Sequence, residues 1–471
     1  MEVLFDGSMP GGTLALLLGC LVVALGFEFV NGFHDTANAV ATVIYTKTLK
    51  PVVAVVFSGV LNFTGVYVGG IAVAIAITRL LPVELLVSGG IGRGLAMVIA
   101  MLLAAVIWNL GTWWKGIPAS SSHTLIGAIL GVGIANSALN GHVGEGVNWD
   151  KALGVGLSLL VSPLVGFGLA AALLWLMHRL VRDERIFKEP VGDLPPPWWI
   201  RGLLVLTCGG VSFSHGSNDG QKGVGLIMLI LIGFVPAGFA LDLDAPSTQL
   251  TAARTSAESM IEHLEQSGLS EGCAEGSTEP ACVIAAEARI IASTLAEHES
   301  VRDIPRDQRW QVREGVLRID DALTHLGRAG ASASVVDELR TDRTRIAPLT
   351  DYAPSWVIFA VALALGVGTM IGWKRIVVTV GEKIGKSKMT YAQGFAAQLV
   401  AMVTIGLSSW FGLPVSTTHV LSSGVAGTMM AEKSGLDSRT IRNIALAWVL
   451  TLPAAMSLSA VLFVGLAELF R

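Results

Sequence analysis

Ten long apolar runs constrain this chain more than any other feature of its sequence. They lie near 12–45, 51–78, 94–114, 117–136 and 151–179, and again near 201–240, 355–373, 390–411, 413–431 and 441–470. A helix needs about 20 mainly apolar residues to cross a bilayer, and a helix satisfies its backbone hydrogen bonds internally. Only 14% of the residues are charged, against about 25% in soluble proteins. The sequence therefore predicts an all-α membrane protein with ten candidate spans, some of them broken or re-entrant.

One acidic block interrupts the apolar pattern between Asp242 and Ala353. It holds 31 of the 68 charged residues, with 20 acidic side chains against 11 arginines. Its expected helices are 248–266, 282–299 and 307–326. Cys273 and Cys282 have the spacing of a loop staple, and a disulfide between them would require an oxidising compartment. We predict that this block is a soluble helical insertion, and our preferred interpretation gives it no role in transport.

Two pairs of similar motifs indicate an internal duplication. NGFHDTANAV (31–40) resembles HGSNDGQKGV (215–224), and GIPASSSH (116–123) resembles GLPVSTTH (412–419). The offset is 184 residues within the first pair and 296 within the second. The difference, 112 residues, equals the length of the acidic block. A duplicated five-span unit with one insertion accounts for both offsets.

The expected boundaries and the basic residues together predict an inverted repeat. The first membrane repeat is 1–200, the second is 201–241 continued in 354–471, and the soluble insertion is 242–353. When the spans alternate, fifteen lysines and arginines fall in loops on one side and three on the other. Such an excess marks the cytoplasmic side, which leaves the N-terminus, the C-terminus and the insertion outside. Because five is odd, the repeats lie inverted, as in many secondary transporters.

Two acidic residues, Asp35 and Asp219, lie inside apolar runs at equivalent places in the two repeats. Ionisable side chains within a span are costly and are functional candidates for that reason. Inverted repeats bring equivalent residues together near the bilayer midplane, so we expect these carboxylates to bind a coupling cation or proton. A plainer alternative is that each caps a broken half-helix. The polar residues expected to join them are His34, Asn38, Asn218, Gln221 and Lys222.

Hydroxyl side chains follow a proline in both copies of the second motif. We call Ser120, Ser121, Ser122 and Thr124 the first hydroxyl string, and Ser416, Thr417 and Thr418 the second hydroxyl string. Each is expected to begin a helix, whose free N–H groups and partial positive charge suit a phosphate-like anion. The plainer alternative is that these hydroxyls bond to the preceding helical turn. His123 and His419 are expected mainly to tie helices together, with anion contact or proton relay as alternatives.

The quoted motifs closely resemble the inorganic phosphate transporter (PiT) family, especially its bacterial low-affinity members. GFHDTANAVATVIYTKTLKP, GSNDGQKGVG, GIPASSSHT and GLPVSTTHV carry the resemblance, which covers both membrane repeats. It implies symport of inorganic phosphate with a proton, or of a neutral metal–phosphate complex, by a homodimer embedded in lipid in the bacterial cytoplasmic membrane. It implies no cofactor and no nucleic-acid partner, and no metal ligand is assigned with certainty. Carried over by position, the site residues are Asp35, Asn38, Asn218 and Asp219, with Ser121, Ser122, Thr417 and Thr418 as phosphate donors.

One departure from the family pattern bears on the coupling ion. The usual Gly-x-Asn-Asp is Gly-Phe-His-Asp in the first motif, so His34 replaces an amide. A side chain that can carry a proton favours proton coupling over sodium coupling.

Other functions fit the sequence less well. A sodium-coupled symporter and a sulfate permease stay open, because sulfate is also a tetrahedral oxyanion. A membrane-embedded hydrolase is disfavoured, because adjacent helix positions such as Ser122 and His123 point in different directions. The chain also has no nucleophile-elbow or HExxH motif. A receptor or structural protein would not need two buried carboxylates, so we predict a transporter and not an enzyme.

Overall fold

The computed structural model describes residues 10–80, 91–141, 147–274 and 276–469. The chain divides into two compact units, a membrane unit (Met1–Phe234 with Pro354–Arg471) and a second unit (Val235–Ala353). The described residues form helices and no strand, apart from an isolated bridge between Gly385 and Leu436. The expectation of an all-α fold is confirmed.

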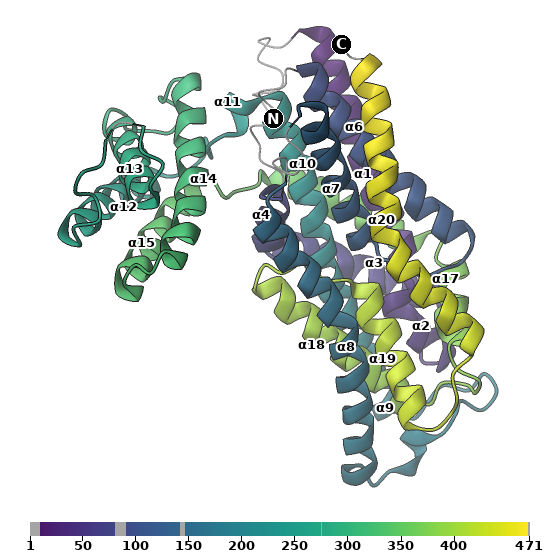
Figure 1. Cartoon of the computed structure of the whole chain (residues 1–471). Coiled ribbons are helices and arrows are strands. Elements are labelled where there is room, and N and C mark those ends of the chain that lie inside the picture. The colour runs from purple at the N-terminus through teal and green to yellow at the C-terminus, as the bar shows by residue number, and fades with distance from the viewer. Residues whose placement is uncertain (1–9, 81–90, 142–146, 275, 470–471) are drawn as a thin grey trace. The chain divides into compact units, whose positions relative to one another are not determined.

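The membrane unit consists of long helices joined by short connections (Figure 1). Before the second unit these are α1 (Gly11–Asp35), α2 (Ala37–Tyr45), α3 (Pro51–Val68), α4 (Ala72–Thr78), α6 (Ile91–Trp114), α7 (Ser121–Leu139), α8 (Trp149–Leu180), η2 (Glu184–Phe187), α9 (Trp198–His215), η3 (Gly216–Gly220) and α10 (Gln221–Phe234). After it come α16 (Ser355–Met370), α17 (Lys374–Val378), η5 (Thr379–Lys383), α18 (Tyr391–Trp410), α19 (Thr417–Ala431) and α20 (Ser438–Leu469).

Fewer helices could cross a bilayer than the ten apolar runs suggest. Within the described residues seven helical stretches have the length and composition of a span, and a bent pair, Ser355–Met370 with Lys374–Lys383, makes up to eight. The expected run 201–240 is missing from this set because the π-helical segment η3 divides it. The expected run 413–431 is missing because α19 has only 15 residues. At 1.5 Å per residue it is about 22 Å long, which is shorter than a hydrocarbon core of about 30 Å.

Both aspartate motifs lie where a helix is interrupted. Asp35 is the last residue of α1, and α2 begins two residues later. The Thr36 hydroxyl between them donates to the backbone oxygens of Gly32 (2.7 Å) and Thr369 (2.9 Å). Asp219 lies within η3, where the backbone adopts a π-helical turn. The interruptions place polar side chains and freed backbone groups inside an otherwise apolar bundle.

Close helix packing holds these interruptions in place. Helix α1 packs against α16, and α9 packs against α3. A Cβ atom at Gly32 would lie 2.4 Å from the Leu365 oxygen, and one at Gly216 would lie 2.2 Å from the Asn62 oxygen. Only glycine allows such an approach, which is typical of helix pairs in membranes. In the same way α7 packs against α20 and α8 against α19.

The second unit is a small helical domain with a core of its own. It contains α11 (Pro236–Phe239), α12 (Ser247–Gln266), α13 (Pro280–Ala296), α14 (Arg306–Arg328), α15 (Ala333–Ile346) and η4 (Ala347–Leu349). Three helices match the expected stretches, and α15 is an addition. Leucine, isoleucine, valine and alanine side chains fill the core. A disulfide joins Cys273 and Cys282, whose Cα atoms lie 5.4 Å apart.

Candidate functional site

The two hydroxyl strings begin helices in nearly the same way. Ser120 caps α7 and Ser416 caps α19, and each serine Oγ accepts the backbone N–H of the histidine three residues later, at 3.2 Å. Gly116 and Gly412 precede the caps with left-handed φ angles of 65° and 67°, which glycine adopts without strain. The prediction that each string starts a helix is confirmed. Their first turns point hydroxyls and N–H groups into the buried interior.

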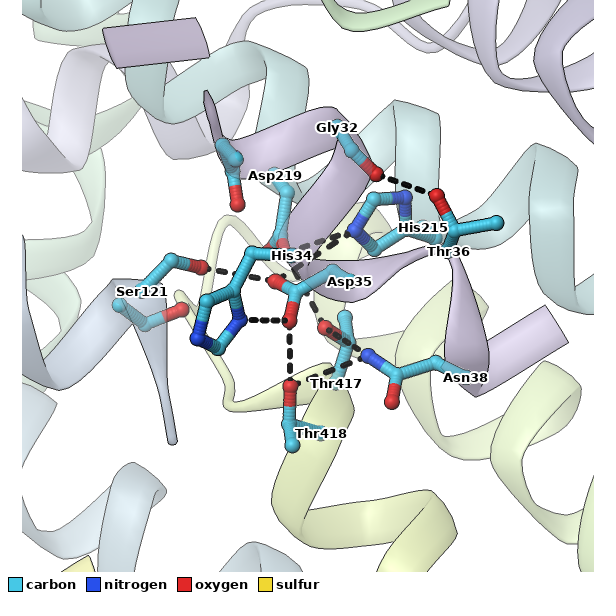
Figure 2. Close-up of polar contacts among 12 residues, drawn as sticks. Gly32, His34, Asp35, Thr36, Asn38, Ser121, His215, Asp219, Thr417 and Thr418 are labelled. Carbon is cyan, nitrogen blue, oxygen red and sulfur yellow. Dashed lines mark hydrogen bonds and ion pairs between the residues drawn. The ribbon is translucent and has the colours of Figure 1, made fainter. Parts of the chain in front are cut away.

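The Asp35 carboxylate joins the two strings (Figure 2). Ser121 Oγ donates to Asp35 Oδ2 at 2.8 Å, and Thr418 Oγ1 donates to Asp35 Oδ1 at 2.6 Å. His34 Nδ1 lies 3.3 Å from Oδ1. All four side chains are buried. One carboxylate therefore contacts segments that lie almost three hundred residues apart in the sequence.

Asp219 occupies the matching position beside the second string. Thr417 Oγ1 donates to Asp219 Oδ2 at 3.0 Å, and Lys222 forms an ion pair with Oδ1. His215 Nε2 lies 3.0 Å from Asp219 Oδ2 and 3.7 Å from Asp35 Oδ2. One ligand atom from each of Asp35, His215 and Asp219 lies within 4.8 Å of the other two. This cluster has the dimensions of a small cation site.

The residue three positions after each aspartate reaches the hydroxyl string of the other motif pair. Asn38 Nδ2 donates to Thr418 Oγ1 at 3.0 Å and to Thr417 Oγ1 at 3.4 Å. Lys222 Nζ donates to Ser122 Oγ at 2.5 Å and to the Val415 oxygen at 2.9 Å. The polar core is thus cross-linked in both directions, with an amide on one side and a positive charge on the other.

Other expected site residues bond to the backbone. The Asn218 amide donates to the Leu413 oxygen at 3.1 Å and accepts the Val415 N–H at 3.3 Å, which fixes the segment that leads into α19. The Gln221 amide accepts the Val73 N–H at 2.7 Å and donates to the Gly69 oxygen at 2.8 Å, so both of its ends are engaged by backbone. Thr124 donates back to the Ser120 oxygen at 2.9 Å. That last bond is the plainer role of a helical hydroxyl.

The histidines of the two strings contact each other. The rings of His123 and His419 have centroids 4.5 Å apart, and His419 also lies 4.1 Å from the Trp448 ring. His34 Nε2 lies 3.1 Å from Thr112 Oγ1 on α6. These contacts tie helices of the core together, as expected for His123 and His419.

Sequence reasoning missed two residues of this core, Glu28 and Asn62. Glu28 is fully buried on α1, and Asn62 Oδ1 lies 2.9 Å from His215 Nδ1. The duplication of motifs could not reveal Glu28, because Ser212 stands 184 residues further on. A lone glutamate inside the first apolar run was the available signal.

Helices that gather two carboxylates, a lysine and two hydroxyl-bearing helix ends in a buried core define a multi-pass membrane protein with a polar site. The phosphate transporter family matches residues 31–459, which include both aspartate motifs and both hydroxyl strings. The chain belongs to this family, and the resemblance found in the motifs is confirmed.

Similar proteins extend over nearly the whole chain. The low-affinity inorganic phosphate transporter PitA of Escherichia coli (strain K12) is 46% identical and covers 95% of this chain and 96% of its own length. The low-affinity inorganic phosphate transporter of Buchnera aphidicola subsp. Acyrthosiphon pisum is 41% identical, with 98% of both chains covered. A solved structure described as the sodium-dependent phosphate transporter shares the fold, with a TM-score of 0.54, 20% identity, and 96% and 99% of the two chains covered. The relatives are named as transporters, in agreement with the prediction that the chain is not an enzyme.

Proposed function

We propose that this protein is a secondary active transporter that takes up inorganic phosphate by symport with a proton. The observation that carries the proposal is the Asp35 carboxylate, which accepts hydrogen bonds from Ser121 of one string and Thr418 of the other. Two helix N-termini with hydroxyl donors meet there, which is an arrangement that suits a tetrahedral anion. The names of the relatives support phosphate as that anion.

The phosphate donors in this proposal are the hydroxyls of Ser121, Ser122, Thr417 and Thr418, with the N–H groups of the first turns of α7 and α19. Those N–H groups have no partner within the helix, and the helix dipole adds positive potential. Lys222 brings a full positive charge to Ser122. Ser120 and Ser416 act as caps that hold the two helix ends in position.

Pseudo-symmetry in the contacts supports two inverted repeats around this site. The offset of 184 relates Asp35 to Asp219, and the offset of 296 relates Ser121 to Thr417. The Ser121–Asp35 and Thr417–Asp219 hydrogen bonds are therefore equivalent. The packing of α1 on α16 has its counterpart in α9 on α3, and α7 on α20 has its counterpart in α19 on α8. Inverted repeats of this kind give alternating access by rocking around a fixed site.

We propose the proton as the coupling ion because His34, which can carry one, lies 3.3 Å from Asp35. Sodium is the second candidate, and the Asp35–His215–Asp219 cluster favours it by its dimensions. A divalent metal that travels with phosphate would use the same cluster. We also propose that both termini and the insertion 242–353 lie outside the cytoplasmic membrane of a bacterial cell, that the insertion is a solvated cap, and that the transporter forms homodimers.

Radiolabelled phosphate uptake into liposomes that contain the purified protein tests this function. We expect an inward proton gradient to accelerate uptake, a sodium gradient without a pH difference to have no effect, and excess unlabelled sulfate not to compete. Equal uptake in protein-free liposomes would refute phosphate transport. Acceleration by sodium alone would replace the proton with sodium, and full competition by sulfate would refute selectivity for phosphate.

A further inference from the structure

Glu28 is a buried acid that the proposed phosphate site does not use. It lies on α1 with Asn31 and Asp35, at positions i, i+3 and i+7 on one helix face. Its side chain is 0% exposed. About 10 Å of helix separates it from Asp35 at 1.5 Å per residue, so it lies next to the site but outside it.

The carboxyl of Glu28 has unusually little support for a negative charge. Asn31 Nδ2 donates to Oε2 at a long distance of 3.4 Å. Among the described residues, Oε1 has no hydrogen-bond partner. The carboxyl packs on Gly223 of α10, where an added Cβ would lie 2.4 Å from its carbon atom. A buried carboxylate with one weak donor is costly, whereas a neutral carboxylic acid is tolerated.

The two aspartates of the core are supported far better. Asp35 accepts bonds from Ser121 and Thr418, and Asp219 has Lys222 and Thr417 as partners. Charged and hydroxyl donors of this kind stabilise the ionised form. Of these three acids, Glu28 is the one whose surroundings favour the protonated state.

Charged neighbours couple Glu28 to the anion site. Asp219, Lys222 and His215, on the helices around η3, interact electrostatically with Glu28. The other helices packed against α1 carry Tyr45 on α2, Arg93 on α6 and His123 on α7, α16 carries no titratable group, and α1 itself adds Cys20 and His34. Arg93 is engaged by Asn136 at 2.6 Å.

We propose that Glu28 is the binding site of the coupling proton, which deepens the proton-coupled phosphate transport proposed above and rests on it. With Glu28 ionised, three carboxylates face the single charge of Lys222, and a phosphate anion would enter a negative core. A proton on Glu28 removes one of those charges, so phosphate binding and proton binding favour each other. The linkage is reciprocal, as any coupling between two sites must be.

The test compares wild type with Glu28→Gln, which keeps the shape and removes the titration. Both are reconstituted in liposomes and assayed for two activities: exchange of labelled for unlabelled phosphate at equal pH, and uptake driven by an inward proton gradient. We expect Glu28→Gln to keep exchange within about threefold of wild type and to lose the acceleration by the gradient. Glu189→Gln, which changes an exposed glutamate, is the matched control and should behave as wild type.

The outcomes separate this inference from the transport function. Gradient-driven acceleration that survives in Glu28→Gln overturns the inference while phosphate transport stands, and loss of exchange together with acceleration overturns it in favour of a structural role. A wild-type protein without phosphate exchange refutes the transport function itself. A second measurement on folded wild type covers a variant that fails to assemble: infrared difference spectra on phosphate addition should show a protonated carboxyl band that shifts in Glu28→Asp. Absence of such a band in wild type also overturns the inference.

Discussion

Replacing Thr418 with valine removes one hydroxyl from the core and changes the side-chain volume little. In the structure this hydroxyl donates to Asp35 at 2.6 Å and accepts from Asn38 at 3.0 Å, and the side chain is buried. A hydrogen bond to a charged group contributes about 1.5–3 kcal/mol. If Thr418 donates to phosphate in the same way, its loss weakens phosphate binding by about 10- to 150-fold.

Proteoliposome uptake measured over a range of phosphate concentrations gives the affinity of the variant. We expect Thr418→Val to raise the half-saturating phosphate concentration by about this factor. Thr418→Ser is the matched control, because it keeps the hydroxyl, and it should stay within about threefold of wild type. Wild-type kinetics in Thr418→Val would refute the assignment of the second hydroxyl string as a phosphate donor.

Three further predictions concern the carboxylates and the insertion. Asp35→Asn and Asp219→Asn should each abolish gradient-driven phosphate uptake while the protein remains folded in the membrane; undiminished accumulation in both would remove these residues from the mechanism. Deleting 245–350 behind a short linker should leave a monodisperse protein in detergent with phosphate uptake intact, and failure of membrane insertion would contradict an independent second unit. Cys273→Ser opens the bridge to Cys282, which spans a sequence separation of 9, and should destabilise the insertion by about 2.5 kcal/mol in the chain-entropy model. Limited proteolysis should then cut the insertion faster, and unchanged cleavage would show that the bridge adds no stability.

Apolar length and paired motifs were enough to predict the helical fold and most of the polar core. Asp35, Asp219 and the hydroxyl strings were predictable because polar side chains inside apolar sequence are costly, and these recur at equivalent places in both repeats. The helix caps at Ser120 and Ser416 followed from proline and small hydroxyl residues at a helix start. The helical content of the acidic block followed in the same way from its apolar periodicity.

The span count and the exact partners could not be predicted, because they depend on tertiary packing. Hydropathy does not reveal that α19 is too short to cross a bilayer or that a π-helical turn divides the run around Asp219. Gln221 was expected beside Asp219, but a side chain two residues further along a helix points elsewhere and bonds to the Val73 backbone. Glu28 has no counterpart in the second motif pair, so the duplicated pattern gives no sign of it.

The most direct test of phosphate binding between the two hydroxyl strings is an experimental structure of the protein with phosphate bound. We expect the phosphate oxygens to accept hydrogen bonds from Ser121 or Ser122 and also from Thr417 or Thr418, beside Asp35. A phosphate that contacts only one hydroxyl string, or that binds away from both, would contradict the proposed site.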